Sequence, residues 1–239
     1  MSKSIINLSG LIFKWILICF IVGILAGASS SLFLYTLNWA TEFRESHLWM
    51  IFLLPVAGLI IGLLYHYYGK KVVKGNNLIL EEYEKPHTII PLKMAPMVYI
   101  GTILTHLFGG SAGREGTAVQ MSTAIADQFT GIFKLTEKER NTILVIVISG
   151  GFASVFGKPL TCAIFAIELL YFSRVSINSI LPSFLTAYIA YYTVAFFQIP
   201  HTHYPKPTLS KIDVSVVFWI IAVGILFGLA ARLFSKSVH

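Results

Sequence analysis

Residues Gly109–Gln120 read GGSAGREGTAVQ, a run of small residues that directly follows an apolar segment ending at Phe108. Its four glycines leave backbone N–H groups uncovered where the next helix, expected over about 116–129, begins. The N-terminus of a helix carries about half a positive charge and unpaired N–H donors, so it can hold a dehydrated anion without a full cation beside it. The sequence therefore predicts an anion site at this helix start.

Glu115 stands at the same place. An ionised carboxylate there can occupy the anion position as a tethered competitor, and a protonated one can move out, so one side chain can be both gate and proton carrier. The alternative is a buried structural ion pair between Arg114 and Glu115. A carboxylate inside a membrane is functional by default, which favours the gate.

Two glycine-containing stretches of this sequence do not fit the nucleotide-binding loops of soluble proteins. The dinucleotide fingerprint needs a strand before its glycines, and here a long apolar helical segment precedes them. The stretch Gly157–Thr161 lacks the spacing of a phosphate-binding loop, and Pro159 stands where a Ser or Thr ligand should be. The sequence also contains no nucleophile–base pair or metal cluster, so an enzyme is not expected.

Composition places the chain in a bilayer. Of its 239 residues, 56% are hydrophobic and 12% are charged, whereas a soluble domain carries about 25% charged residues. Several apolar runs are too short to cross upright, which is typical of transporters whose broken helices end inside the membrane. The first run exceeds the 7 to 15 residues of a signal-peptide core, so we expect a retained helix. The predicted segments are Leu11–Leu37, Met50–Tyr68, Pro91–Phe108, Ile143–Phe156, Leu160–Phe172, Ile177–Phe197 and Val214–Phe234.

The charge is basic, with 18 Lys and Arg against 11 Asp and Glu. In a membrane protein this excess indicates cytoplasmic loops rather than nucleic-acid binding. The positive-inside rule predicts a multi-pass cell-membrane protein whose N-terminus is cytoplasmic, together with the loops that hold Lys70, Lys71 and Lys74 and Lys134, Lys138 and Arg140.

No cofactor or metal is expected. Cys19 and Cys162 lie in apolar segments without CxxC spacing, and His201 and His203 have no carboxylate or cysteine partner nearby.

An internal repeat organises the chain. The pattern from Val22 to Gly27 returns from Val223 to Gly228, and Leu32-Phe33 returns at the same offset of 201 positions. Coincidence among apolar letters is the alternative. We expect a first transmembrane repeat over 1–200, an extracellular inter-repeat loop over 201–210, and the first helix of a second repeat over 211–239. A complete protein of this design has about 400 residues.

Three GxxxG spacings predict close helix packing within the fold. They occur at Gly23/Gly27, Gly58/Gly62 and Gly224/Gly228.

Three stretches carry a family resemblance. Gly113–Thr117 resembles the GREGP signature of the CLC chloride channel and transporter family. Gly157–Glu168 is similar to the family's helix that follows a short Pro-Leu turn, and Gly75–Ile79 resembles a diverged form of its GSGIP loop. The resemblance implies an all-α integral membrane fold, namely a CLC-type inverted-repeat bundle with broken, tilted helices, of which the first repeat and the start of the second are present.

The resemblance also assigns roles. Glu115 resembles the gating, proton-transferring glutamate, and Asn76 takes the place of the central serine. Other ligands belong to the family's second half. The anion-binding residues implied are Asn76, Asn77, Gly113, Arg114, Gly116 and Thr117.

Departures from the family's motifs point to one branch of the family. Thr117 replaces proline and Asn76-Asn77 replaces the serine loop, which resembles the fluoride-exporting, proton-coupled branch. Leu169 stands where chloride/proton antiporters have an inner glutamate, directly after the glutamate that Glu168 resembles. His106 is expected to be a hydrogen-bonded residue at a helix end.

The best expectation is therefore proton-coupled fluoride export. The alternatives are a chloride channel or chloride/proton antiporter, and a non-transporting fragment or assembly partner. The implied partners are fluoride or chloride, protons, the lipid bilayer and a second copy of the chain in a homodimer, with helices from about Leu160 to Phe197 at the subunit interface.

Overall fold

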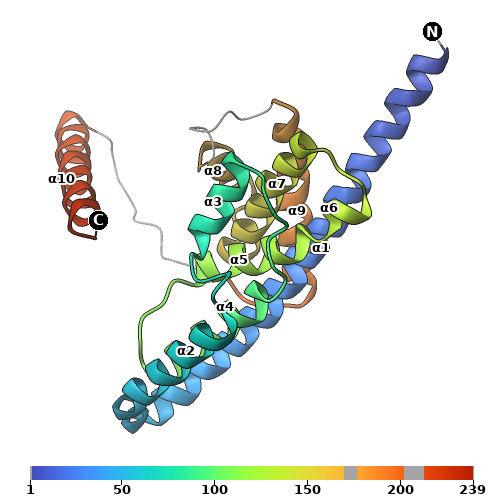
Figure 1. The fold of residues 1–239 in the computed structure, drawn as a ribbon. Coiled ribbons are helices and arrows are strands. Elements are labelled where there is room, and N and C mark those ends of the chain that lie inside the picture. Colours follow the sequence, from blue (N-terminus) through green and yellow to red (C-terminus); the bar gives the residue numbers. More distant parts are fainter. Residues whose placement is uncertain (1, 170–176, 202–212, 239) are drawn as a thin grey trace. The chain divides into compact units, whose positions relative to one another are not determined.

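Helices make up the computed structural model, which describes residues 2–169, 177–201 and 213–238 and contains no strand within them (Figure 1). The chain forms two compact units, Met1–His201, which holds α1 to α9, and Thr202–His239, which holds α10. The elements are α1 (Ser2–Ser46), η1 (Leu48–Leu53), α2 (Leu54–Tyr68), α3 (Asn76–Glu84), α4 (Met94–Leu107), α5 (Arg114–Ala126), α6 (Phe129–Ile132), α7 (Glu137–Phe156), α8 (Pro159–Leu169), η3 (Ile177–Ser179), α9 (Ile180–Phe196) and α10 (Val214–Val238).

Four helical segments are long and apolar enough to cross a bilayer. They are Ser9–Ser46, Leu48–Tyr68, Glu137–Phe156 and Val214–Ser237. The apolar helices α4, α8 and α9 are shorter, with 14, 11 and 17 residues. At 1.5 Å per residue none of these three reaches the roughly 30 Å of a hydrocarbon core. The predicted mixture of spanning and broken helices is confirmed.

Helix boundaries differ from the sequence predictions in two informative places. The helix expected from residue 116 begins at Arg114 and ends at Ala126. The stretch after Gly75, compared above with a loop, is helical from Asn76 onward, because Gly75 takes a left-handed φ of 56° and turns the chain into α3. The predicted inter-repeat loop lies, apart from His201, outside the described residues.

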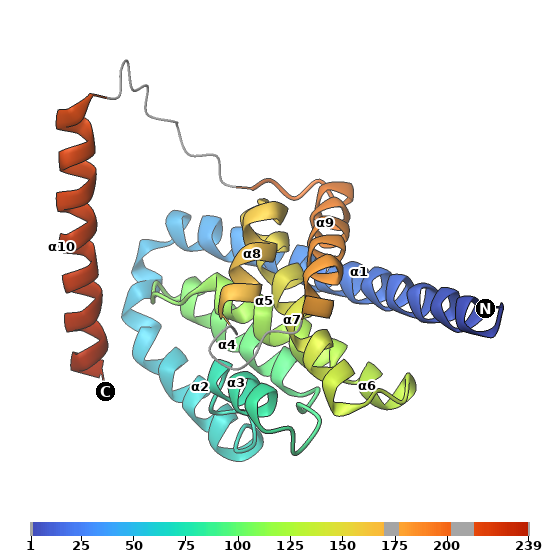
Figure 2. The same cartoon turned by 90° about the horizontal axis from the view of Figure 1, so that it is seen from above.

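Helix α7 is the central element of the first unit. Its start is set by a capping box between Thr136 and Glu139, and its end by Gly157 in the left-handed conformation, which explains the Gly-Lys-Pro stretch without a nucleotide. Ile143 to Ile148 are all buried, as expected for a helix that is apolar all round. α1, α5, α8 and α9 contact it (Figures 1 and 2).

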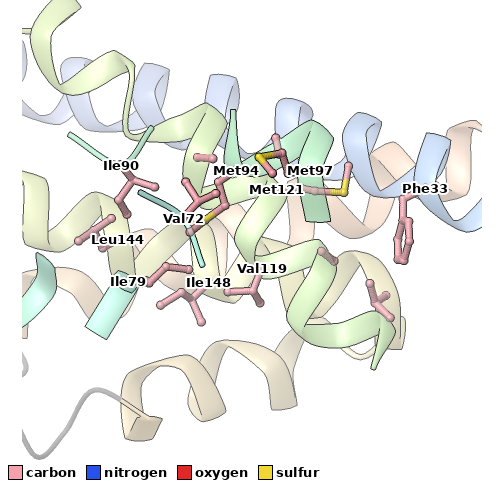
Figure 3. Close-up of a cluster of buried hydrophobic side chains, with 14 of the residues drawn as sticks. Phe33, Val72, Ile79, Ile90, Met94, Met97, Val119, Met121, Leu144 and Ile148 are labelled. Atoms are coloured by element: carbon pink, nitrogen blue, oxygen red, sulfur yellow. The ribbon is translucent and has the colours of Figure 1, made fainter. Parts of the chain in front are cut away.

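A hydrophobic cluster joins the helices that carry the candidate site (Figure 3). Each labelled side chain in it is at most 5% exposed. The cluster links α1, α3, α4, α5 and α7 through Phe33, Ile79, Met94, Met97, Val119, Met121, Leu144 and Ile148, with Val72 and Ile90 from the connections.

The two glycine pairs of this unit behave differently. A Cβ on Gly23 would lie 2.7 Å from Ile189, and one on Gly27 would lie 2.5 Å from Thr193 and 2.8 Å from the Ala190 carbonyl oxygen. Gly23/Gly27 therefore brings α1 and α9 into backbone contact, as predicted. Around Gly58 and Gly62 the described structure is open, with nothing within 4 Å of either Cβ position.

A buried charge triad ties three helices together. Arg140 of α7 bonds Asp127 through Nε (2.8 Å) and Nη2 (2.7 Å), and bonds Glu82 of α3 through Nη1 (3.0 Å). At most 7% of any of these three side chains is exposed. Asp127 directly follows α5 and also accepts from the Ile90 N–H at 2.8 Å. The C-terminal ends of α3 and α5 are thus held by one guanidinium.

Glu82 is fully engaged. Desolvation acts to raise the pKa of this carboxyl, but hydrogen bonds from the His87 N–H, Arg140 and Thr88 outweigh it, and the pKa lies below its ordinary value. Arg140, counted above among loop cations, is not a loop charge. It lies in the first turn of α7 with its charge neutralised internally.

Removal of the guanidinium is expected to destabilise the first unit strongly. Arg140→Met leaves two buried carboxylates without their cation, a change that typically costs about 3–5 kcal/mol. The matched control is Lys14→Met, which breaks the partly exposed pair with Glu139 and should cost less than about 1 kcal/mol. SDS titration of the purified chain in mixed micelles measures both, and equal effects would contradict the buried role.

Substitution by alanine at the two glycine pairs should change the stability of the unit in opposite directions. Gly27→Ala forces α1 and α9 apart and is expected to destabilise by about 1–3 kcal/mol, as overpacking does. Gly62→Ala meets open space and should stabilise α2 by up to about 1 kcal/mol. The same SDS titration compares them, and a neutral Gly27→Ala would show that this contact adjusts freely.

Candidate anion site

Two uncapped helix starts meet at the candidate site. α3 begins at Asn76 after Gly75, and α5 begins at Arg114 after Gly113; neither has a side-chain cap. The Asn76 Nδ2 atom lies 3.0 Å from the position that a Cβ on Gly116 would take. Both helix starts carry the positive end of a helix dipole, although the Asn77 and Leu78 N–H groups of α3 already bond the Lys74 and Gly75 carbonyl oxygens. This is the arrangement that an anion stabilises.

Glu115 faces a cavity of about 450 Å³ at the start of α5. Its Oε2 lies 3.6 Å from the Cβ position of Gly113, so the carboxylate bends back toward the start of its own helix. About a third of the side chain is exposed. The group can therefore sit over the helix start and still exchange a proton with water in the cavity.

Arg114 and Glu115 form a weak pair. Arg114 Nε lies 3.5 Å from Glu115 Oε1, and the two side chains are 33% and 35% exposed. The alternative considered above was a buried structural pair, but this pair is only partly buried. Partly exposed pairs contribute about 1 kcal/mol or less, so Arg114 does not lock the carboxylate in place.

Thr117 fixes the first turn of α5. Its buried hydroxyl donates to the Gly113 carbonyl oxygen at 3.1 Å and lies 2.7 Å from the Thr102 hydroxyl of α4. Its contacts are thus inside the protein. Asn77 is exposed, and its backbone N–H bonds the Lys74 carbonyl oxygen at 3.1 Å. Direct anion contact by Asn77 or Thr117 stays a prediction.

Residues beyond the motif complete the cavity. His106 ends α4 with Nδ1 3.0 Å from the Thr102 carbonyl oxygen, as expected for a helix-end histidine, and it also lines the cavity. α1 contributes Asn38, Thr41 and Glu42, which sequence analysis did not single out. Their i, i+3, i+4 spacing places them on one face of a helix, and this polar stripe was the available signal. Leu37 and Ala112 are the remaining apolar lining residues.

Residues 57–239 match the family described as "Voltage gated chloride channel". The chain belongs to this family. It is therefore a multi-pass membrane protein, in agreement with its apolar helices.

The relatives sharpen the comparison. The chain is 46% identical over 226 residues to a "Chloride/fluoride channel protein" of Pseudomonas syringae pv. tomato, covering 95% of this chain and 50% of that protein. It is 25% identical to an "H(+)/Cl(-) exchange transporter ClcA" of Vibrio parahaemolyticus, covering 95% and 52%. A solved structure, "Crystal structure of a CLC-type fluoride/proton antiporter", matches with a TM-score of 0.85 and 34% identity, covering 91% of this chain and 55% of that one. The chain spans about half the length of the relatives it matches.

Proposed function

We propose that this chain forms the first half of a proton-coupled fluoride exporter in which Glu115 is the gate and proton carrier. The supporting observation is the Glu115 carboxylate at the uncapped start of α5, with the Asn76 carboxamide of a second helix start 3.0 Å from the Cβ position of the adjacent Gly116. The similarity to a fluoride/proton antiporter and to a chloride/fluoride channel protein favours the same activity.

The mechanism follows from competition for one electrostatic site. When Glu115 is ionised, its carboxylate occupies the region of positive dipole at the helix start and excludes the anion. Protonation removes its charge, so the side chain moves toward the cavity and an anion takes its place. For exchange, Glu115 takes up its proton from one side of the membrane and loses it to the other side, and the returning carboxylate expels the anion toward the side from which the proton came. One residue thereby links anion and proton movement in opposite directions.

The proposed preference for fluoride follows from the hydrogen-bond donors at the site. Fluoride is small, strongly hydrated and a strong hydrogen-bond acceptor, so a site that replaces its water needs good donors, which the Asn76 carboxamide and the backbone amides of Gly113, Arg114 and Gly116 supply. Thr117 holds this turn rigid through Thr102. Leu169 at the end of α8 is not ionisable, which disfavours the route used by chloride/proton antiporters.

The orientation proposed above is supported by contacts at one end of the first unit. Lys14 bonds Glu139 at the start of α7, and Arg140 in the same turn bonds Glu82 at the end of α3. Lys14 of α1 and Lys138 in the first turn of α7 thus lie at this end of the unit. We propose that it faces the cytoplasm.

The proposed function is tested by anion efflux from liposomes under an imposed pH gradient, with fluoride and chloride electrodes. The chain should release fluoride faster than chloride and move protons in the opposite direction, and Glu115→Gln should abolish proton movement because its amide cannot titrate. Glu137→Gln, at the exposed start of α7, removes a carboxylate away from the site and should change nothing.

Each other outcome selects an alternative. Chloride flux without protons indicates a passive channel, and coupled chloride flux indicates a chloride/proton antiporter. No flux of either anion from the chain alone indicates a non-transporting fragment or assembly partner. Unchanged proton coupling in Glu115→Gln overturns the gate.

A homodimer with α8 and α9 at its interface is the proposed assembly. Light scattering in detergent should give twice the 26.6 kDa mass of the chain. Leu181→Trp, at a side chain of α9 that is 78% exposed, should shift the mass toward the monomer, whereas Leu59→Trp on exposed α2 should not. A monomer at all protein concentrations would contradict the proposal.

A further inference from the structure

Gln120 lies one turn beyond the predicted motif residues. It follows Gly116 by four positions on α5, so both residues share one face of the helix. Its carboxamide packs against the start of α3: Nε2 is 3.4 Å and Oε1 is 3.6 Å from the Cβ position of Gly75. The same Nε2 is 4.0 Å from the Cβ position of Gly116. Gln120 thus reaches the place where the two helix starts meet.

Asn76 reaches the same place from the other helix. Its Nδ2 is 3.0 Å from the Cβ position of Gly116. Two carboxamide nitrogens from different helices therefore lie within 4.0 Å of one point, which is bare because residue 116 is a glycine. Any side chain at residue 116 would occupy the space between them.

Neither carboxamide is used elsewhere. Within the described residues, no hydrogen bond joins the Asn76 or Gln120 side chain to another group, whereas Gln128, which follows α5, donates to the carbonyl oxygens of Ile90 and Ala124, both at 2.8 Å. Asn76 is exposed and Gln120 is half-buried, so both carboxamides can reach solvent and neither is held by a bond within the protein. The free N–H donors of Gln120 and Asn76 are available to a ligand that accepts hydrogen bonds.

We infer that Gln120 is a further anion-binding residue, which with Asn76 forms a pair of carboxamide donors that selects fluoride over chloride. This inference rests on the proposed function and assigns the substrate preference to a residue outside the GREGT motif. Fluoride surrenders more hydration than chloride on entering the site, so it depends more on replacement donors. Loss of one carboxamide should therefore weaken the binding of fluoride more than the binding of chloride.

The test is Gln120→Met, which keeps an unbranched side chain of similar length and removes the donors. Initial efflux rates of both anions from liposomes are measured over a concentration series. The fluoride-to-chloride rate ratio should fall by about tenfold, with a weaker apparent fluoride affinity and a smaller change in maximal rate. Gln128→Met is the control, since it removes the same group from a residue that follows the C-terminal end of α5, away from Gly116, and should leave the ratio unchanged.

The outcomes separate this inference from the proposed function. An unchanged fluoride-to-chloride ratio in Gln120→Met, or an equal fall in the transport rates of both anions, would mean that Gln120 only fills space. Either result would overturn the inference and leave the proposed function intact. If the unaltered chain moves neither anion, the proposed activity of the chain fails. Fluoride titration calorimetry in detergent then decides: weaker binding by Gln120→Met supports the inference, and equal or absent binding by both chains overturns it.

Discussion

The structure depends on holding two helix starts of the same polarity close to each other. The N-terminal ends of α3 and α5 repel one another, and no side chain caps either. The opposing force acts at the other ends of the two helices, where Arg140 draws Glu82 and Asp127 together. An apolar cluster fixes the segments between, from Ile79 on α3 to Val119 on α5. The proposed anion region is thus supported by charges placed roughly 18 Å away along α5.

The amino-acid sequence predicts the fold class and the position of a helix start near Glu115 well, and the supporting contacts poorly. Glu115 and its glycines are contiguous, and a helix start follows from them directly. The triad joins positions 82, 127 and 140, which no local pattern connects, so Arg140 was assigned to a surface loop. α3 was missed for a similar reason: it has nine residues, it carries three glutamates and no cap precedes it. The polar lining from α1 depends on tertiary packing and carries only a weak periodic signal.

The GxxxG spacing has two different structural effects in the first unit. At Gly23/Gly27 the missing side chains admit the backbone of α9, while at Gly58/Gly62 they face open space. The residues at the spacing are the same, and the neighbour decides their effect. Gly116 illustrates a third use, in which the missing side chain leaves room for two carboxamides rather than for a helix.

The contact between α1 and α9 has a consequence for biogenesis. Gly23 and Gly27 pack on Ile189 and Thr193, which the ribosome adds about 165 residues later. At roughly 5–20 residues per second this interval is on the order of ten to thirty seconds. During it the first helix waits in the bilayer with its glycine face unpaired, open to lipid, to the insertion machinery or to another nascent chain. Within the first unit, the glycine face of the earliest helix is therefore covered only after α9 has been made.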